Sequence, residues 1–165
     1  MMDTAPLIAE ITAAFDGIAR EDGVSLREGD AIDGCVSDKK RAAARRLDTD
    51  TRWQDVSNAD LLDYYNSLVY LDAKGFRYYL PAYIVYDLRQ SVNYEYGVSG
   101  YTLSHLYPPD DGSQWERLRL ITPPQGQAIS SFLRFVVTHG DDDNRQEAAK
   151  YLAGYWNQYC NSDTE

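Results

Sequence analysis

Cysteine and long apolar runs are scarce in this chain of 165 residues. Its two cysteines, Cys35 and Cys160, lie far apart and show no metal-ligand spacing, so we expect free thiols in a reducing compartment. No segment reaches the roughly 18 consecutive apolar residues that a membrane-spanning helix requires. The first residues also lack the basic region and apolar run of a secretory signal. These absences predict a cytoplasmic protein.

The sequence motifs that mark common catalytic sites are missing as well. We find no glycine-rich phosphate loop, nucleophile elbow, His-Glu metal motif or Cys/His dyad, and no pattern surrounds His105. His139 precedes the acidic run Asp141–Asp143, which could offer oxygen ligands to a cation but lacks the alternating ligands of a calcium loop. We interpret this stretch as the end of one helix and the start of the next. The sequence therefore predicts no catalytic residue, no metal site and no cofactor.

Positive charge is in the minority, with 16 Lys and Arg against 26 Asp and Glu and a net charge of −10. This balance argues against nucleic acid and anionic membranes as partners. It keeps a cytosolic protein soluble and also favours a cationic partner. One cationic island runs from Lys39 to Arg46. We expect a solvated helix face that pairs with Asp48, Asp50 and Asp55, the alternative being a site for an anion or a nucleic acid.

Apolar residues are plentiful, at 44% of the chain, and 14 tyrosines stand against 4 phenylalanines. This composition is typical of a packed globular protein, and the length suits a single domain over residues 1–165. Apolar residues recur at three- and four-residue intervals through most of the chain. An irregular segment at about 93–120 interrupts them. The sequence thus predicts an all-α fold, or nearly so: a helical bundle around a buried central helix.

The segment from Gly75 to Tyr86 is apolar and aromatic almost without a break, so it predicts that central helix. We expect Gly75 to end the preceding helical pattern and the central helix to begin near Leu80, with Pro81 in its first turn. Helix starts are also marked by two capping-box pairs: Ser25 with Glu28, and Thr122 with Gln125.

Four features occur in order along the chain: Trp53, the Gly75–Tyr83 segment, the helix start Ile121–Gln125 and the closing pair Tyr155–Trp156. Together they resemble a family of uncharacterised bacterial proteins with an F-R-Y-Y-L-P-A-Y core, here Phe76–Tyr83, and a following L-T-x-x-Q helix. Ile121 stands where that pattern has Leu. The resemblance covers about residues 50–160. It implies a shared fold and a bacterial origin, and it implies no activity and no site residues.

Arg77 is the charged residue of this core that we expect to be partly buried. Its guanidinium could bind a carboxylate or phosphate in bidentate fashion. The interpretation that we favour is structural: an ion pair with Asp72 or Asp87, together with stacking on tyrosine.

For the function we favour a protein-binding module over a catalyst. An acidic cytosolic protein without a catalytic motif fits an immunity protein that neutralises a basic toxin, because opposite charges steer the two together. The expected contact surface is the irregular segment, although its aromatic residues could equally pack the domain's own edge. The candidate binding residues are Arg77, Tyr94, Tyr96, Tyr101, Tyr107, Asp110, Asp111, Trp115 and Glu116. The alternative is an enzyme or small-molecule-binding protein whose pocket is lined by Arg77, Tyr78 and Tyr79.

Overall fold

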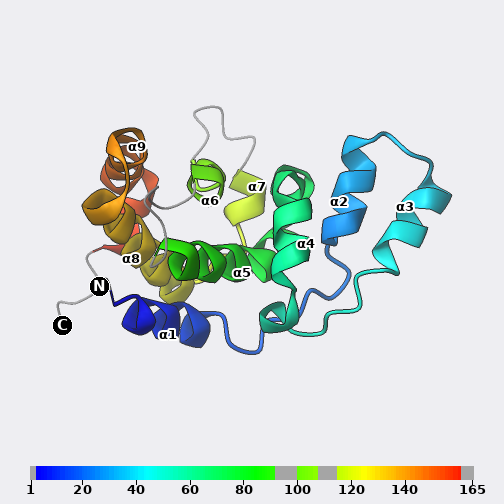
Figure 1. Ribbon diagram of the computed structural model, residues 1–165, viewed down its shortest axis with the longest axis horizontal. Helices are drawn as coiled ribbons and strands as arrows, with labels where there is room; N and C mark the ends of the chain where they lie inside the picture. The colour runs from blue at the N-terminus through cyan, green and yellow to red at the C-terminus, as the bar shows by residue number, and fades with distance from the viewer. Residues whose placement is uncertain (1–2, 92–99, 108–114, 161–165) are drawn as a thin grey trace. The chain divides into compact units, whose positions relative to one another are not determined.

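The computed structural model describes residues 3–91, 100–107 and 115–160, with the backbone alone at Ser91 and Trp115 (Figure 1). All secondary structure in these residues is helical and no strand occurs among them, which confirms the predicted all-α fold. No described helix combines the length and apolar character that crossing a bilayer requires.

The residues group into two units by their contacts. The first unit comprises Met1–Asp16, Ile84–Gly112 and Ile121–Glu165, and the second comprises Gly17–Tyr83 and Ser113–Leu120. Helix α5 (Ala73–Ser91) begins in the second unit and ends in the first. A single domain over residues 1–165 remains the prediction for the chain as a whole.

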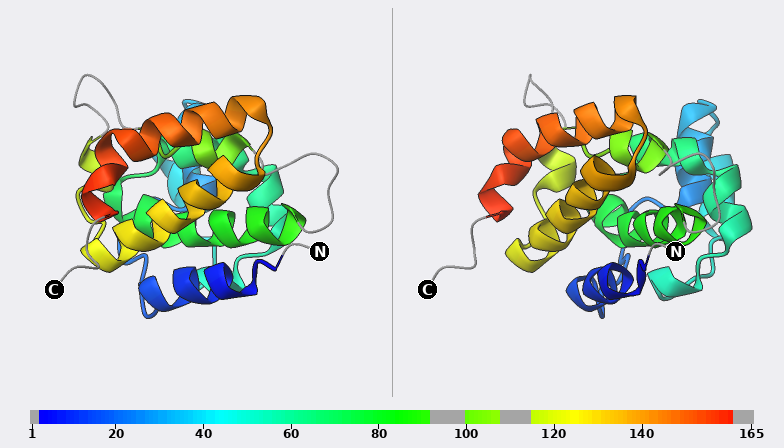
Figure 2. Two further views of the ribbon diagram at one scale, coloured as in Figure 1. Left: turned by 90° about the vertical axis from the view of Figure 1, so that its left-hand side faces the viewer. Right: turned by 60° about the vertical axis from the view of Figure 1, so that its left-hand side comes forward.

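Helix α8 is the centre of packing in the first unit. The helices of this unit are α1 (Ala5–Ala14), α6 (Gly100–Ser104), α8 (Pro123–His139), α9 (Asp142–Ala153) and the 3₁₀ helix η3 (Tyr155–Tyr159). Helix α8 contacts α1, α9 and η3, and Figure 2 shows it passing between α1 and α9. Thr122 donates its N–H to Gln125 Oε1 at 3.1 Å, so the predicted start of α8 is confirmed. Its apolar face, which includes Phe132 and Leu133, is fully buried.

Helix α2 (Leu26–Asp33) organises the second unit by contacting α3 (Asp38–Arg45) and the 3₁₀ helix η2 (Tyr65–Tyr70). The other short elements are the 3₁₀ helix η1 (Trp53–Asp55), α4 (Asn58–Asp63) and α7 (Trp115–Leu118). Glu28 Oε2 accepts the N–H of Ser25 at 3.2 Å, which confirms the predicted capping interaction at the start of α2.

The central helix α5 is buried as predicted, but its predicted start is wrong. It begins at Ala73 rather than near Leu80, so that Gly75 and Pro81 both lie inside it. Asp72 caps the first turn, because its Oδ1 accepts the N–H of Gly75 at 2.9 Å. Pro81 has no N–H, so the carbonyl oxygen of Arg77 lacks its usual helical donor, a cost that the burial of the apolar side chains of α5 offsets. Its fully buried side chains are Phe76, Tyr78, Tyr79, Leu80, Ile84 and Leu88.

Gly75 is required because the backbone of another segment passes close to it, and the helix does not break there. A Cβ on this residue would lie 2.3 Å from the carbonyl oxygen of Val24. The same Asp72 Oδ1 that caps α5 also accepts the N–H of Val24 at 3.0 Å. The absence of a side chain at Gly75 therefore lets the chain before α2 lie directly on the first turn of α5.

Candidate functional site

A pocket of about 300 Å³ lies in the second unit, and aspartate dominates its wall. It is lined by Arg27, residues 47–51, residues 55–57 and Asp60, and we call it the aspartate pocket. The chain between α3 and α4 forms most of it, while α2 supplies Arg27 and α4 supplies Asp60. Ser57 fixes the entry into α4, because its Oγ accepts the N–H of Asp60 at 3.1 Å.

One side of the pocket is an arginine bound by two carboxylates. Arg27 Nη1 lies 2.5 Å from Asp48 Oδ1, and Nη2 lies 2.6 Å from Asp60 Oδ1. Asp48 Oδ2 also accepts the backbone N–H of Arg27 at 2.9 Å, so both oxygens of this buried carboxylate are used. Burial alone would lower the pKa of Arg27, but the bonds to Asp48 and Asp60 outweigh it and raise that pKa. Arg27 is therefore fully committed to these two partners.

The other two carboxylates of the pocket, Asp50 and Asp55, form no ion pair with any residue that the structure describes. Asp55 is exposed and Asp50 is half-buried. Four carboxylates thus face one arginine, and the pocket keeps a negative charge. A cation that entered it would be attracted by both unpaired groups.

Behind Asp50 lies a buried polar layer. Tyr79 donates its hydroxyl to Asp50 Oδ2 at 3.4 Å. Burial, and then a contact of its hydroxyl with the Asp50 carboxylate that is weaker than an ordinary hydrogen bond, raise the pKa of Tyr78. Arg20 Nη2 donates to the carbonyl oxygen of Asp48 at 3.3 Å, while its buried Nε and Nη1 have no partner in the same residues. The layer therefore holds hydrogen-bonding groups that the described protein does not satisfy.

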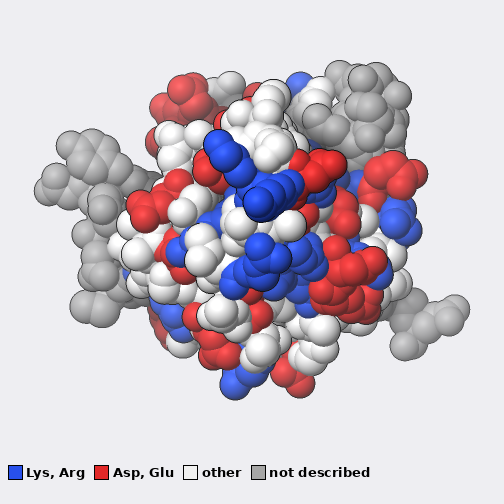
Figure 3. Space-filling model, turned by 90° about the vertical axis from the view of Figure 1, so that its right-hand side faces the viewer, with Lys and Arg blue, Asp and Glu red and all other residues white. Residues whose placement is uncertain are grey.

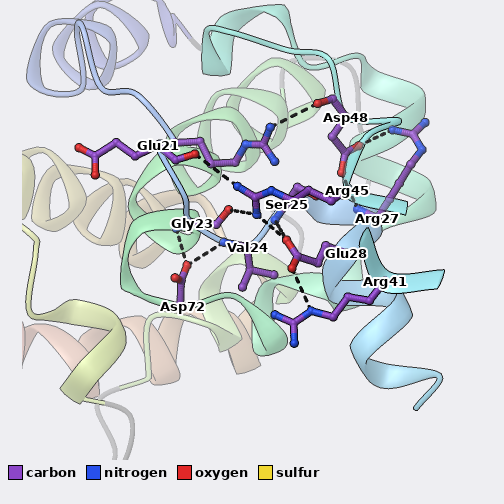
Figure 4. Close-up of polar contacts among 12 residues, drawn as sticks. Glu21, Gly23, Val24, Ser25, Arg27, Glu28, Arg41, Arg45, Asp48 and Asp72 are labelled. Carbon is purple, nitrogen blue, oxygen red and sulfur yellow. Dashed lines mark hydrogen bonds and ion pairs between the residues drawn. The ribbon is translucent and has the colours of Figure 1, made fainter. Parts of the chain in front are cut away.

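A second network of charges fixes α3 to α2 (Figure 4). Arg41 Nε donates to Glu28 Oε1 at 2.9 Å, and Arg45 Nη1 donates to Glu28 Oε2 at 2.6 Å. Arg45 Nη1 also donates to the carbonyl oxygen of Gly23 at 2.7 Å. Burial alone would raise the pKa of Glu28, but the bonds from Arg45, the Ser25 N–H and Arg41 outweigh it and lower that pKa. Glu28 therefore stays ionised although its side chain is buried.

The cationic island of α3 is a helix face that forms ion pairs, as predicted, but the predicted partners are wrong. Figure 3 shows basic side chains gathered on the face where α2 and α3 lie, with acidic side chains around them. Its exposed cations are Lys39, Lys40 and Arg46. The half-buried arginines of α3 pair with Glu28 rather than with Asp48, Asp50 or Asp55. The physical reason is that Asp48 is already bound by Arg27, which leaves Glu28 as the carboxylate facing α3.

Replacing Glu28 with glutamine is expected to lower the free energy of unfolding by about 2 kcal/mol, because charge-assisted hydrogen bonds from two arginines are lost. Urea unfolding at neutral pH measures this difference. The matched control is Glu21→Gln, because the Glu21 side chain that pairs with Lys74 is 51% exposed against 8% for Glu28, and that ion pair should contribute less than about 1 kcal/mol. Equal losses in the two variants would contradict a structural role for the Glu28 network.

Arg77 lies half-buried on α5 and does not line the aspartate pocket. Its Nη1 donates to the carbonyl oxygen of Leu120 at 3.5 Å, and its buried Nε has no partner among the described residues. The predicted ion pair with Asp72 or Asp87 does not form within those residues. Asp72 instead accepts backbone N–H groups, as described above. Arg77 therefore has a backbone partner where the sequence predicts a carboxylate.

The other candidate contact residues are described only in part. Outside the described residues lie Tyr94, Tyr96, Asp110 and Asp111, and the side chain of Trp115. Tyr101 is 56% exposed on α6. The Tyr107 ring lies 5.6 Å from that of Tyr151, and Glu116 pairs with Arg119 at 3.1 Å. Tyr101 and Tyr107 belong to the first unit and Glu116 to the second, so the described members of the set are divided between the units.

The run from His139 to Asp143 ends one helix and starts the next, as predicted. His139 is the last residue of α8, and its ring packs 4.7 Å from that of Phe135. Asp141 caps α9 by accepting the N–H of Asn144 at 2.9 Å. Within the described ranges, no group of three or more His, Cys, Asp or Glu side chains is placed to hold a metal ion.

No motif in the sequence predicts the aspartate pocket. Asp48, Asp50 and Asp55 enter the sequence argument only as partners of the basic run. A usable signal exists in the alternation of aspartate and threonine over Asp48–Thr51, because short polar side chains in this pattern favour turns rather than an ion-paired helix face. This alternation indicates a polar loop but not a pocket, because Arg27 and Asp60 come to lie beside the loop only in the folded chain.

Comparison with known protein families places this helical chain in one of them. Residues 3–160 match the family described as "Family of unknown function (DUF6714)". The match also takes in most of the N-terminal third, which the predicted resemblance over residues 50–160 leaves out. Neither the curated proteins nor the solved structures yield a match. Because the match spans almost the whole sequence, the chain belongs to the family of unknown function DUF6714.

Proposed function

We propose that this chain is a protein-binding module for a basic partner, acting as an immunity protein that neutralises a basic toxin in the cytoplasm of a bacterium. The observation that carries the proposal is the aspartate pocket, in which two carboxylates have no cationic partner among the described residues. The net charge of −10 supports it, since it attracts a basic protein over a distance. A nuclease is a suitable toxin, because binding to nucleic acid requires a basic surface.

The alternative of a small-molecule pocket lined by Arg77, Tyr78 and Tyr79 has no comparable observation in its favour. The side chains of Tyr78 and Tyr79 are fully buried, and the Tyr79 hydroxyl is bonded to Asp50. We therefore assign these two tyrosines a role in supporting the aspartate pocket from behind.

Affinity capture from the source cells tests the proposal. The tagged chain is used as bait at low and at moderate salt, and an unrelated protein of similar size and net charge is the control bait. We expect one basic protein to be recovered in stoichiometric amount by this chain alone, and to be lost as salt rises because exposed charge pairs are screened. The activity of that protein should fall to zero at one equivalent of the chain. Recovery of the same proteins by both baits, or of no basic protein, would overturn the proposal.

A further inference from the structure

We infer that a second pocket binds a small monocarboxylate with an apolar body, and that Arg41 and Arg117 attract its carboxylate. This pocket has a volume of about 440 Å³, and all the residues that line it belong to the second unit. Ile32 of α2 and the neighbours Val69 and Tyr70 of η2 line it, so we call it the α2–η2 pocket. It shares no lining residue with the aspartate pocket, and the inference therefore goes beyond the proposed function.

Most of the wall of the α2–η2 pocket is apolar. Val24 and Leu71 line it and are buried, while Ile32 is half-buried. Val69 and Tyr70 also line it, with 47% and 37% of their surfaces exposed. The volume falls within the range of roughly 300–1,000 Å³ that is usual for small-molecule pockets. The apolar part of a ligand would remove the exposed surfaces of Val69 and Tyr70 from water, which favours binding.

The fold holds these walls in place before a ligand arrives. Asp72 Oδ1 accepts the N–H of Val24 at 3.0 Å and that of Gly75 at 2.9 Å, so it joins the chain before α2 to the first turn of α5. Tyr70 donates its hydroxyl to Asp33, the last residue of α2, and this bond restrains the Tyr70 ring. A pocket with restrained walls loses little conformational entropy when its ligand binds.

Arg41 supplies the pocket with a guanidinium whose outer donors are still available. Its Nε donates to Glu28 Oε1 at 2.9 Å, whereas its two Nη groups donate to no residue that the structure describes. Figure 4 shows the guanidinium of Arg41 beside Glu28, on the side where Val24 lies. Since Glu28 is also bound by Arg45, these three side chains together carry one excess positive charge. The Nη groups of Arg41 can therefore bind an anion without breaking the Glu28 network.

Arg117 of α7 supplies a second guanidinium, and it lies in a poorly solvating place. Its Nη1 donates to the carbonyl oxygen of Leu68 at 3.2 Å, and its guanidinium carbon lies 5.2 Å from the centre of the Phe76 ring. Burial lowers the pKa of Arg117, because the charged form has lost part of its hydration. An anion that enters the pocket would offset this loss, and the guanidinium is already oriented by Leu68 and Phe76.

The charge of the lining favours a monoanion. Arg41 and Arg117 face one carboxylate of the lining, that of Asp72, which leaves one positive charge in excess on a chain whose net charge is −10. Two further carboxylates are bonded to lining side chains. The charge of Glu28 is offset by Arg45, and Asp33 is exposed, so that solvent and salt screen it. A carboxylate matches a guanidinium in geometry, and an apolar body matches the rest of the wall.

The test uses the full-length chain and probes of one size: hexanoate, 1-hexanol and hexylammonium, at neutral pH. Binding is followed by chemical-shift changes of assigned backbone amides. We expect hexanoate to shift the amides of residues 69–72 and of Ile32, 1-hexanol to bind at the same place about tenfold more weakly, and hexylammonium to leave these amides unchanged. Butanoate should bind more weakly than hexanoate by about fourfold for each methylene removed. Equal affinity for hexanoate and 1-hexanol, or shifts confined to other residues, would overturn the inference.

Two substitutions test the role of the arginines. Arg41→Gln and Arg117→Gln should each weaken hexanoate binding about tenfold, because each removes a charge that attracts the carboxylate. The matched control is Lys40→Gln, which removes an exposed charge from α3 outside the lining and should bind hexanoate like the wild type. Urea unfolding checks that each variant is folded. Wild-type affinity in either arginine variant would contradict the assignment.

A further pair of variants leaves both arginines intact and changes only exposed residues. Val69→Glu places a negative charge in the lining and should reduce hexanoate binding at least tenfold, through repulsion and the loss of apolar surface. Leu62→Glu makes the same kind of change on α4 outside the lining, where the side chain is 54% exposed, and should leave binding unchanged. If Val69→Glu bound hexanoate as tightly as Leu62→Glu, the α2–η2 pocket would not be the binding site.

Discussion

Replacing Asp87 with asparagine is expected to stabilise the protein at pH 8 by up to about 4 kcal/mol, and to change its stability little at pH 4. Asp87 lies on α5 with only 3% of its surface exposed, and one of its oxygens has no hydrogen-bond partner among the described residues. Burial raises the pKa of this carboxyl from 3.8 to about 7, and a hydrogen bond with Thr102 opposes that rise only in part. The charged form is therefore held in a poorly solvating place.

The sign of the pH dependence follows from the two pKa values of Asp87. In the unfolded chain the carboxyl ionises near 3.8, whereas in the folded protein it does so near 7. Wild-type stability should thus fall as pH rises through this window and level off above it. Asparagine does not titrate. The gain in free energy of unfolding of Asp87→Asn over the wild type should therefore develop between about pH 4 and pH 7 and stay constant at higher pH.

Urea unfolding of both proteins at a series of pH values measures this difference directly. The control is Asp63→Asn, which removes an exposed charge from α4 and should change stability by less than about 0.5 kcal/mol at every pH. A constant difference between Asp87→Asn and the wild type from pH 4 to pH 8 would show that Asp87 does not titrate in this window.

Replacing Gly75 with alanine is expected to lower the free energy of unfolding by about 3 kcal/mol, although the same change in an unobstructed helix raises it by up to about 1 kcal/mol. The reversal of sign comes from the Val24 carbonyl oxygen, which would lie 2.3 Å from the new Cβ. Neither atom can move without its backbone, so α5 and the chain before α2 must separate. The bond from the Val24 N–H to Asp72 Oδ1 would then be strained or lost.

Thermal and urea unfolding of Gly75→Ala test this expectation, with Gly34→Ala as the matched control. Gly34 follows α2, and the nearest atom to its added Cβ is 3.6 Å away, an ordinary contact distance. The control should therefore be close to wild type in stability. If Gly75→Ala were as stable as its control, the close approach of Val24 to α5 would be refuted.

The sequence predicts elements whose signals are local. The Ser25–Glu28 and Thr122–Gln125 capping pairs are short-range chemistry, and both helix starts are confirmed. Gly75 misleads because a glycine that admits a neighbouring backbone looks, in sequence, the same as one that ends a helix. The residue that requires a glycine at position 75 is Val24, which lies far away in the sequence. The periodicity of residues around Gly75 therefore cannot reveal this requirement.

The candidate site is harder to predict because it depends on competition between distant charges. Arg27 could be paired with any of several nearby aspartates, and only the fold assigns it to Asp48 and Asp60. That assignment decides which carboxylates remain unpaired. The aromatic residues of segment 93–120 attract attention in the sequence, and the contact surface expected there stays a prediction.

Arg27 and Glu28 are consecutive residues of α2, and they bind in two directions. Arg27 holds the loop of the aspartate pocket through Asp48, while Glu28 holds α3 through Arg41 and Arg45. The pocket loop and α3, the helix that precedes it in the chain, are therefore both held by the same turn of α2. A binding loop restrained before its ligand arrives loses little conformational entropy when the ligand enters. Under the proposed function, substitutions at Glu28 should therefore weaken recognition of the partner by loosening α3 next to the pocket loop, without removing any atom that lines the pocket.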